Sequence, residues 1–251
     1  MNELIAAGLN EINFSTGDEH TKFIPLESVM LAAKLSLEKL LPVLIMIELK
    51  QYSVVTIDTI KNHEMLKGLS EEAKMRLQYI ESPWMPLNPS LIEKYPEGKV
   101  SNMENLAARG GCDSVLETYV IQANGKIGSC CGLGMRLIPE LNSEICRGDT
   151  FLKEAIDKSE KDFLKLWLRY MGPEKILAWA AHKNPDIKWE NMYAHKCQAC
   201  MRMYKDSMVK KVIKENYEEM ISEVLLTAYI DDIYAPNQFA KNIDSVGSTE
   251  S

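Results

Sequence analysis

Val43-Leu-Ile-Met-Ile47 is an uninterrupted apolar run near the start of the chain. It follows a helical pattern at 26–40, which Pro42 ends, and an alternation of polar and apolar residues at 11–15 precedes that helix. A short apolar run of this kind is typical of a strand that is buried on both faces of a parallel sheet. Because parallel neighbours need a crossover helix, this part of the chain predicts a β-α-β unit.

The segment that follows extends the same pattern and then ends. Residues 57–79 predict a helix with a break near Gly68, and 79–82 predict a third short strand. Residues 86–111 are rich in Pro and Gly and show little periodicity, which is typical of a boundary between domains. The sequence therefore predicts three parts, at 1–90, 91–234 and a disordered tail at 235–251.

Beyond this boundary the chain changes in character. Two strand-like runs flank Asn124-Gly125, which is the strongest short-range signal of a β-hairpin because a type I′ turn needs positive φ angles. We therefore expect a hairpin at 116–130. Helical patterns follow it at 149–170, 173–182 and 203–230.

Composition excludes several classes of function. The 251 residues carry a net charge of -7, so the basic footprint of a nucleic-acid-binding protein is missing. The opening residues show no export signal, and the longest apolar run, 40–47, is far shorter than the roughly 20 residues that cross a bilayer. We expect a cytoplasmic protein that contacts neither nucleic acid nor membrane. Its six cysteines should then be reduced thiols, available for metal binding or catalysis.

Four of the cysteines have the spacing of a metal site. Cys112 is followed by twelve residues, then Gly125, then four more, then Cys130, and far downstream come Cys197 and Cys200 as Cys-Gln-Ala-Cys. A tight Cys-x-x-Cys turn lets two sulfurs face one metal, and a distant second pair completes either a tetrahedral zinc site or the corners of an iron–sulfur cube. Both interpretations stay open at this point.

The hairpin sets a condition on this site. With a two-residue turn, Cys130 lies opposite Tyr119, and Cys112 would be roughly 23 Å away if the chain between were extended. The segment from Cys112 to Leu116 must therefore fold back as a turn, and the preceding Gly110-Gly111 pair makes such a bend sterically easy.

The cysteine spacing resembles the auxiliary-cluster domain of radical S-adenosylmethionine enzymes, in particular its short "twitch" form. The resemblance rests on Cys112, Gly125, Cys130 and the pair at 197 and 200, and Cys131-Gly132 is also typical of that region. The longer SPASM form continues with further cysteines after Cys200, and this chain has none there. The resemblance implies one auxiliary [4Fe-4S] cluster held by Cys112, Cys130, Cys197 and Cys200.

The first segment resembles the same family. Residues 4–18 are similar to the fourth strand of its barrel, where a serine, here Ser15, commonly faces S-adenosylmethionine. Residues 43–48 and 79–82 would be the fifth and sixth strands. The implied fold class is α/β: a partial (β/α) barrel made of strands 4–6, followed by a small α+β twitch domain with a β-hairpin and C-terminal helices.

One departure from the family limits the activity that the resemblance implies. The cluster that cleaves S-adenosylmethionine is bound by a Cys-x3-Cys-x2-Cys motif, and no cysteine precedes Cys112. The chain would be the C-terminal part of such a protein and would use S-adenosylmethionine only together with an N-terminal half or a partner chain. That partner would complete the barrel and cover the exposed edge of the strand at 11–15.

The function implied by the resemblance is radical modification of a peptide or small metabolite, in which the auxiliary cluster conducts electrons or binds the substrate. The alternative is a non-catalytic binding or structural module whose four cysteines hold zinc. Whether this chain by itself is an enzyme stays open.

Other residues have two interpretations each. Ser15, Asp18 and His20 either line a substrate pocket at the carboxyl end of a strand or form a turn. His195 is either a ligand, a hydrogen-bond donor to a cluster sulfur, or a surface residue. Cys131 and Cys146 fall outside the spacing, and we expect them to be small buried hydrophobic residues.

Overall fold

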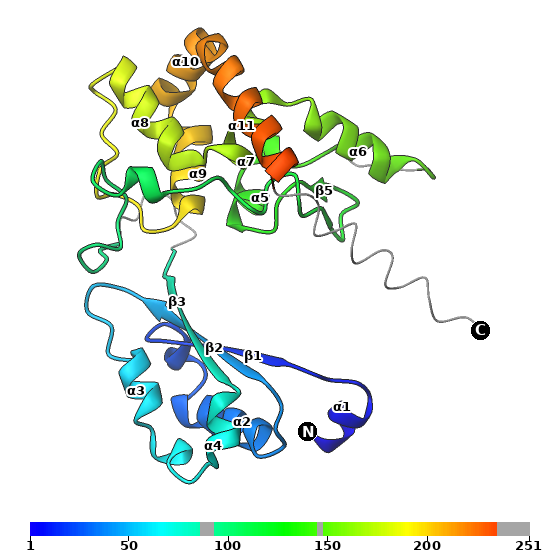
Figure 1. Ribbon diagram of the computed structural model, residues 1–251, viewed down its shortest axis with the longest axis vertical. Coiled ribbons are helices and arrows are strands. Elements are labelled where there is room, and N and C mark those ends of the chain that lie inside the picture. Colours follow the sequence, from blue (N-terminus) through cyan, green and yellow to red (C-terminus); the bar gives the residue numbers. More distant parts are fainter. Residues whose placement is uncertain (86–92, 145–147, 235–251) are drawn as a thin grey trace. The chain divides into compact units, whose positions relative to one another are not determined.

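The computed structural model describes residues 1–85, 93–144 and 148–234. The chain forms two compact units, Met1–Lys99 and Val100–Ser251, whereas the sequence predicts a boundary after residue 90. Figure 1 shows a sheet with helices in the first unit and mainly helices in the second. The predicted tail at 235–251 and Cys146 lie outside the described residues.

The first unit contains a three-stranded parallel sheet in the order β1-β2-β3. After helix α1 (Asn2–Ala6), the strands are β1 (Ile12–Thr16), β2 (Val43–Leu49) and β3 (Leu77–Pro83). Ile12 pairs with Val43, and Val43 pairs with Leu77, so the three strands start level with one another. The predicted β-α-β arrangement and the third strand are confirmed.

The crossovers in this unit are shorter helices than the sequence predicts. Helix α2 (Leu26–Leu37) ends before Leu40, whose φ of 58° cannot continue a helix. The second crossover has three pieces: α3 (Ile57–Lys61), η2 (Glu64–Leu66) and α4 (Glu71–Met75). Ser70 caps α4 by accepting a hydrogen bond from Ala73 N at 3.2 Å, as the predicted break near Gly68 requires.

In the part of the chain that the structure describes, helices cover one face of the sheet and leave the other open. Val43, Ile45 and Ile47 of β2 are buried against the apolar sides of α2, α3 and α4, which Figure 1 shows on one side of the sheet. On the other face, Met46 is 40% exposed and Ile80 is 46% exposed. The prediction that β2 is buried on both faces is therefore wrong. Within the described residues the sheet does not close into a barrel.

The second unit begins with a small antiparallel hairpin. After η3 (Leu106–Ala108), strands β4 (Val120–Ile121) and β5 (Ile127–Gly128) pair with Ile121 opposite Ile127. The loop has three residues rather than two, because Gln122 N donates to Lys126 O at 2.9 Å. Within it, only Gly125 has a positive φ, 79°, the pattern of a type I turn followed by a left-handed residue.

The hairpin prediction is thus right in place and wrong in detail. The strands are far shorter than 116–130, and pairing of Val120 with Gly128 shifts the register by one residue. Cys130 therefore does not lie opposite Tyr119. The physical reason is that Asn124 does not take a left-handed conformation; its Oδ1 accepts a hydrogen bond from Lys126 N at 3.0 Å instead.

Helices make up the rest of the second unit. They are α5 (Leu133–Leu137), η4 (Pro139–Leu141), α6 (Phe151–Glu160), α7 (Phe163–Tyr170), α8 (Pro173–Lys183), α9 (Lys196–Lys205), α10 (Ser207–Asn216), η5 (Tyr217–Met220) and α11 (Ile221–Tyr234). The predicted helix at 149–170 breaks at Asp162, which caps α7. None of the helices in the described part of the chain is long and apolar enough to cross a membrane.

The core of the second unit is formed by α7, α8, α9 and α10. Trp167 of α7 and Ile176 of α8 are fully buried in it. Cys130 and Cys200 belong to this core, and Cys112 packs against it half-buried. Of the predicted metal ligands, two are therefore part of the main hydrophobic core of this unit, and Cys112 and Cys197 are half-buried.

Candidate functional site

Cys197 and Cys200 lie in the first turns of α9 and not on the tight turn that the sequence predicts. His195 is the N-cap of this helix, and its Nδ1 accepts a hydrogen bond from Cys197 N at 3.1 Å. The side chain of Gln198 reaches back to accept from His195 N at 3.1 Å, which completes a capping box. The two cysteines are three residues apart on a helix, so they share one face of α9. His195 is thus a helix cap, and burial lowers its pKa.

Cys112 is held by backbone contacts with the end of α7. Its amide donates to Leu168 O at 2.9 Å. A Cβ on the preceding residue, Gly111, would come within 1.9 Å of Arg169 O. The glycine is therefore required for close packing of two backbones rather than for the flexible bend that the sequence suggests.

The chain after Cys112 folds back as predicted. Residues 113–117 form a turn in which Leu116 has a φ of 65°, and Leu116 N donates to Ser129 O at 3.1 Å. Because Ser129 precedes Cys130, this bond ties the turn after Cys112 to the segment that carries the second cysteine.

Cys130 lies three residues before α5, and backbone amides at the beginning of this helix point toward its sulfur. Gly132 N and Met135 N donate to this sulfur, which lowers its pKa, while burial raises the pKa by more. Amide donors to a sulfur stabilise its thiolate form, the form that binds metals.

Two further contacts bring the helix of Cys197 to the other two segments. Lys196 Nζ donates to Gly111 O at 2.5 Å, next to Cys112. Gly132 lies so close to Cys197 that a Cβ there would be 2.9 Å from its Sγ. Three segments that are distant in the sequence therefore meet at the four predicted ligands.

Electrostatics give the same picture for the buried thiol of Cys200. Burial raises the pKa of Cys200 well above its usual value, and repulsion from Cys197, Cys112 and Cys130 raises it further. All four are free thiols. Across the described residues, however, no three His, Cys, Asp or Glu side chains are arranged to hold a metal ion as they lie. To bind one, the cysteine side chains would have to turn toward a common point.

Cys131 differs from the four. It is exposed, so the prediction that it is a buried hydrophobic residue is wrong. Its sulfur accepts a hydrogen bond from Ser114 Oγ at 3.0 Å, and its amide donates to the same oxygen at 2.7 Å. It therefore bridges the turn after Cys112 from the outside.

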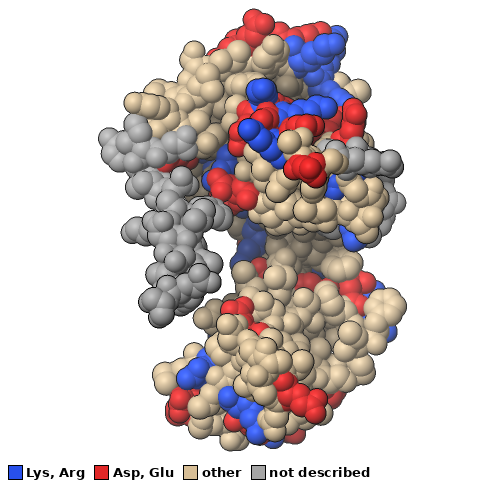
Figure 2. All heavy atoms as spheres, turned by 90° about the vertical axis from the view of Figure 1, so that its right-hand side faces the viewer, with Lys and Arg blue, Asp and Glu red and all other residues tan. Residues whose placement is uncertain are grey.

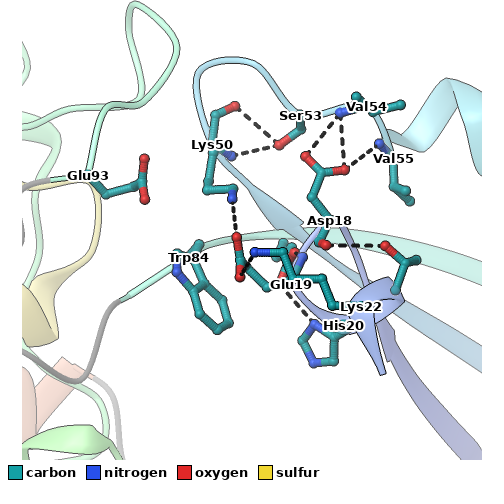
Figure 3. A network of polar contacts seen from close by, with 12 residues as sticks. Asp18, Glu19, His20, Lys22, Lys50, Ser53, Val54, Val55, Trp84 and Glu93 are labelled. Atoms are coloured by element: carbon teal, nitrogen blue, oxygen red, sulfur yellow. Dashed lines mark hydrogen bonds and ion pairs between the residues drawn. The ribbon is translucent and has the colours of Figure 1, made fainter. Parts of the chain in front are cut away.

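A second group of polar residues lies at the carboxyl end of the parallel sheet in the first unit. Asp18 follows β1, and its carboxylate accepts hydrogen bonds from Val54 N and Val55 N, the latter at 2.9 Å (Figure 3). This carboxylate therefore fixes the loop after β2. Ser15 lies upstream on the open face of the sheet, where it is exposed.

Glu19 is the centre of an ion-pair network at this edge. Lys22 Nζ and Lys50 Nζ each lie 2.6 Å from one of its carboxylate oxygens (Figure 3). These two lysines lower the pKa of Glu19 to about 2. An open hollow of about 390 Å³ is lined by Asp18, Lys50, Gln51, Tyr52, Glu93 and Lys94.

The sequence gives no prediction for Glu48, although it is central to this edge. Its side chain is buried, pairs with His20 and accepts a hydrogen bond from Glu19 N. Gly17 makes room for it, because a Cβ there would come within 1.8 Å of Cγ of Glu48. The sequence signal is an acidic residue directly after the apolar run 43–47, and its partner His20 is 28 residues away.

Charge on the surface is mixed. Figure 2 shows Lys and Arg interspersed with Asp and Glu on the face drawn, with no large patch of one sign. This agrees with the net charge of -7 and gives no support to a nucleic-acid interface.

Comparison of the sequence with models of known protein families and with curated proteins finds no match.

Proposed function

We propose that the chain is the C-terminal part of a radical S-adenosylmethionine protein and binds one auxiliary [4Fe-4S] cluster. In this proposal the first unit supplies strands 4–6 of a (β/α) barrel, and the second unit is a twitch-type cluster domain. The observation that carries it is the convergence of four free thiols from three distant segments on one partly buried place in the second unit.

The chemistry of the donor set fits such a cluster. Four cysteines match the ligand number of a [4Fe-4S] cube, and the sulfur of Cys130 already accepts two backbone amide hydrogen bonds. Repulsion among the thiols at Cys200 would be relieved by a cationic centre. A cube with a cysteine at each iron supplies electron transfer, and we favour this role over binding of the substrate.

The open face of the sheet supports the part of the proposal that concerns a partner. Parallel sheets are stable when both faces are covered, yet Met46 and Ile80 are exposed on one face. Leu31 and Leu35, which lie four residues apart on α2, are also about half exposed. Figure 2 shows that a large part of the first unit on the face drawn carries no charged side chain. We propose that an N-terminal half or a partner chain covers these surfaces and brings the cluster that cleaves S-adenosylmethionine.

Anaerobic reconstitution of the full chain with iron and sulfide tests the metal. We expect a brown protein with broad visible absorption and about four irons per chain. The alternative, a structural or binding module, uses the same four thiols for zinc, because zinc also accepts four cysteines in a tetrahedral site. A colourless protein that takes up one zinc and excludes iron would support this alternative and overturn the cluster.

A second experiment tests the dependence on a partner. With reductant and S-adenosylmethionine, the isolated chain should form no 5′-deoxyadenosine above background. Turnover by the chain alone would show that an activating cluster has been overlooked.

Light scattering of the isolated chain should show self-association, and replacement of exposed Met46 by Glu should reduce it. A wild-type chain that is monomeric would argue against the half-barrel.

The substrate of the whole protein would be a peptide or a small metabolite. The hollow beside Asp18 and Lys50 is large enough for a small molecule and lies at the carboxyl end of the strands, where barrel proteins place their sites.

A further inference from the structure

His20, which is partly exposed, pairs with the buried carboxylate of Glu48. Neither residue has a role in the proposed cluster site. Nδ1 of His20 lies 2.9 Å from Oε2 of Glu48. The side chain of Glu48 is 4% exposed and that of His20 is 38% exposed. The pair lies at the carboxyl end of β1 and β2, and both residues belong to the first unit.

The surroundings of Glu48 hold its carboxylate in place. Its second oxygen, Oε1, accepts a hydrogen bond from Glu19 N. The backbone of Gly17 packs directly against its side chain. With one oxygen on a backbone amide and the other on His20, the carboxylate has little freedom to turn.

This arrangement sets the tautomer of the histidine. An ionised carboxylate only accepts hydrogen bonds, so Nδ1 of His20 must carry the hydrogen that it donates to Glu48. A neutral imidazole has one N–H, so Nε2 of His20 is then a free acceptor. In Figure 3 the second ring nitrogen of His20 lies on the far side of the ring from the ion-pair network.

The charged side chains near His20 and Glu48 are engaged in contacts with other residues. Glu19 pairs with Lys22 and Lys50, and Asp18 accepts backbone hydrogen bonds. On its other side His20 meets the ring of Trp84 edge-on, with 6.4 Å between ring centroids. Among the described residues, no contact places another donor or acceptor on Nε2 of His20.

We propose that His20 and Glu48 form a proton-accepting dyad. In it, Nε2 of His20 accepts a proton or a hydrogen bond from the hydroxyl or ammonium group of a small molecule bound at the carboxyl end of the sheet. Glu48 is a positioning residue that fixes the tautomer and orientation of the ring. The proton of a ligand ammonium group moves to Nε2, which leaves the neutral amine and gives an imidazolium that Glu48 stabilises through Nδ1–H, whereas a ligand hydroxyl keeps its proton and donates a hydrogen bond to Nε2. This proposal does not depend on the cluster, since none of its residues is a cysteine or lies in the second unit.

The tautomer is measured directly by nitrogen-15 NMR of the full wild-type chain at a pH where its histidines are neutral. We expect His20 to carry its hydrogen on Nδ1. His63 is the matched reference, because its Nδ1 accepts a hydrogen bond from Met65 N at 3.4 Å and its hydrogen should therefore be on Nε2. A His20→Asn variant assigns the signal. If His20 carries its hydrogen on Nε2, as His63 does, the dyad is wrong.

Diethyl pyrocarbonate, which reacts at an unprotonated ring nitrogen, tests whether Nε2 is available. We expect His20 to be modified several-fold faster than His63, and Glu48→Gln to abolish this difference. Glu81→Gln is the matched control: Glu81 lies in β3, pairs with Lys99 at 2.8 Å and touches no histidine, so its variant should react as the wild type does. Equal rates for His20 and His63 in the wild-type chain would overturn the proposal whether or not the Glu48 variant folds.

Discussion

The two units of this chain use their apolar residues in opposite ways. In the first, helices pack on one face of a three-stranded sheet and leave Met46 and Ile80 exposed on the other. In the second, helices surround a core in which Trp167 is fully buried and to which Cys130 and Cys200 belong. The second unit therefore encloses its largest side chains within its own helices, whereas the described part of the first unit leaves apolar side chains exposed on one face of its sheet.

The largest effect should come from the core of the second unit. Trp167→Ala removes a fully buried side chain and should lower the free energy of unfolding by about 3–5 kcal/mol. Chemical denaturation followed by circular dichroism measures this loss. Trp179→Ala, at a half-buried position on α8 where the ring packs edge-on against Trp167, should cost less because part of its side chain is already exposed. Equal losses would mean that the core is not closed around Trp167.

The two faces of β2 can be compared at neighbouring positions. Ile45→Ala, on the covered face, should lower the free energy of unfolding by about 2–5 kcal/mol because it leaves a cavity. Met46→Ala, on the open face, should change it by no more than about 0.5 kcal/mol. The same denaturation experiment measures both. A large loss for Met46→Ala would show that something covers this face in the chain alone.

Helix caps give a smaller effect in each unit. Asp162 caps α7 by accepting from Leu164 N at 3.0 Å, and Ser70 caps α4 by accepting from Ala73 N. Replacing either by Ala should cost about 1 kcal/mol. Asp162→Ala should also loosen the core around Trp167, which Ser70→Ala cannot do. Thermal melts of both variants measure the two losses of stability. A broader melting transition for Asp162→Ala than for Ser70→Ala would show that α7 supports the packing around Trp167.

The smallest effect should be the acid dependence of the first unit. The pKa of Glu19 is lowered from 4.5 to about 2 by Lys22 and Lys50, so its ion pairs stabilise the fold above pH 4.5, and this contribution is lost as the pH falls toward 2. Glu19→Gln should flatten the fall in stability over this range. Urea denaturation between pH 5 and 2 measures the slope, and Glu71→Gln, in an exposed pair, is the control. An unchanged slope in Glu19→Gln would show that the ion pairs of Glu19 do not contribute to the acid dependence of stability.

The sheet was predictable because its strands are short apolar runs between helical patterns. The exposure of one face of the sheet could not be predicted, because the burial of Met46 depends on whether a second layer packs on that face. The residues 43–47 are apolar in either case. The predicted register of the hairpin is wrong because Asn124 can either take a left-handed conformation or accept a hydrogen bond from the backbone. In the structure its side chain accepts a hydrogen bond from Lys126 N.

The two sites were predictable to different degrees. The four cysteines have a spacing that chemistry constrains, so their convergence was expected. The sequence does not predict that α9 begins at Lys196 and contains Cys197, because its N-cap, His195, is a residue type that is uncommon there. Gln198, at the capping-box position, is the signal that could have shown it. Glu48 was missed because its partners come from another strand end, and pairing between distant segments leaves no local pattern.

The central claim is that Cys112, Cys130, Cys197 and Cys200 act together as one cluster site, and metal content per chain tests it most directly. After anaerobic reconstitution, the wild-type chain should hold about four irons and four sulfides. Each Cys→Ala change at these four positions should sharply reduce that content, while exposed Cys131→Ala should leave it unchanged. Iron retained by a Cys197→Ala, Cys200→Ala double variant, or a wild-type content of about eight irons, would contradict the account.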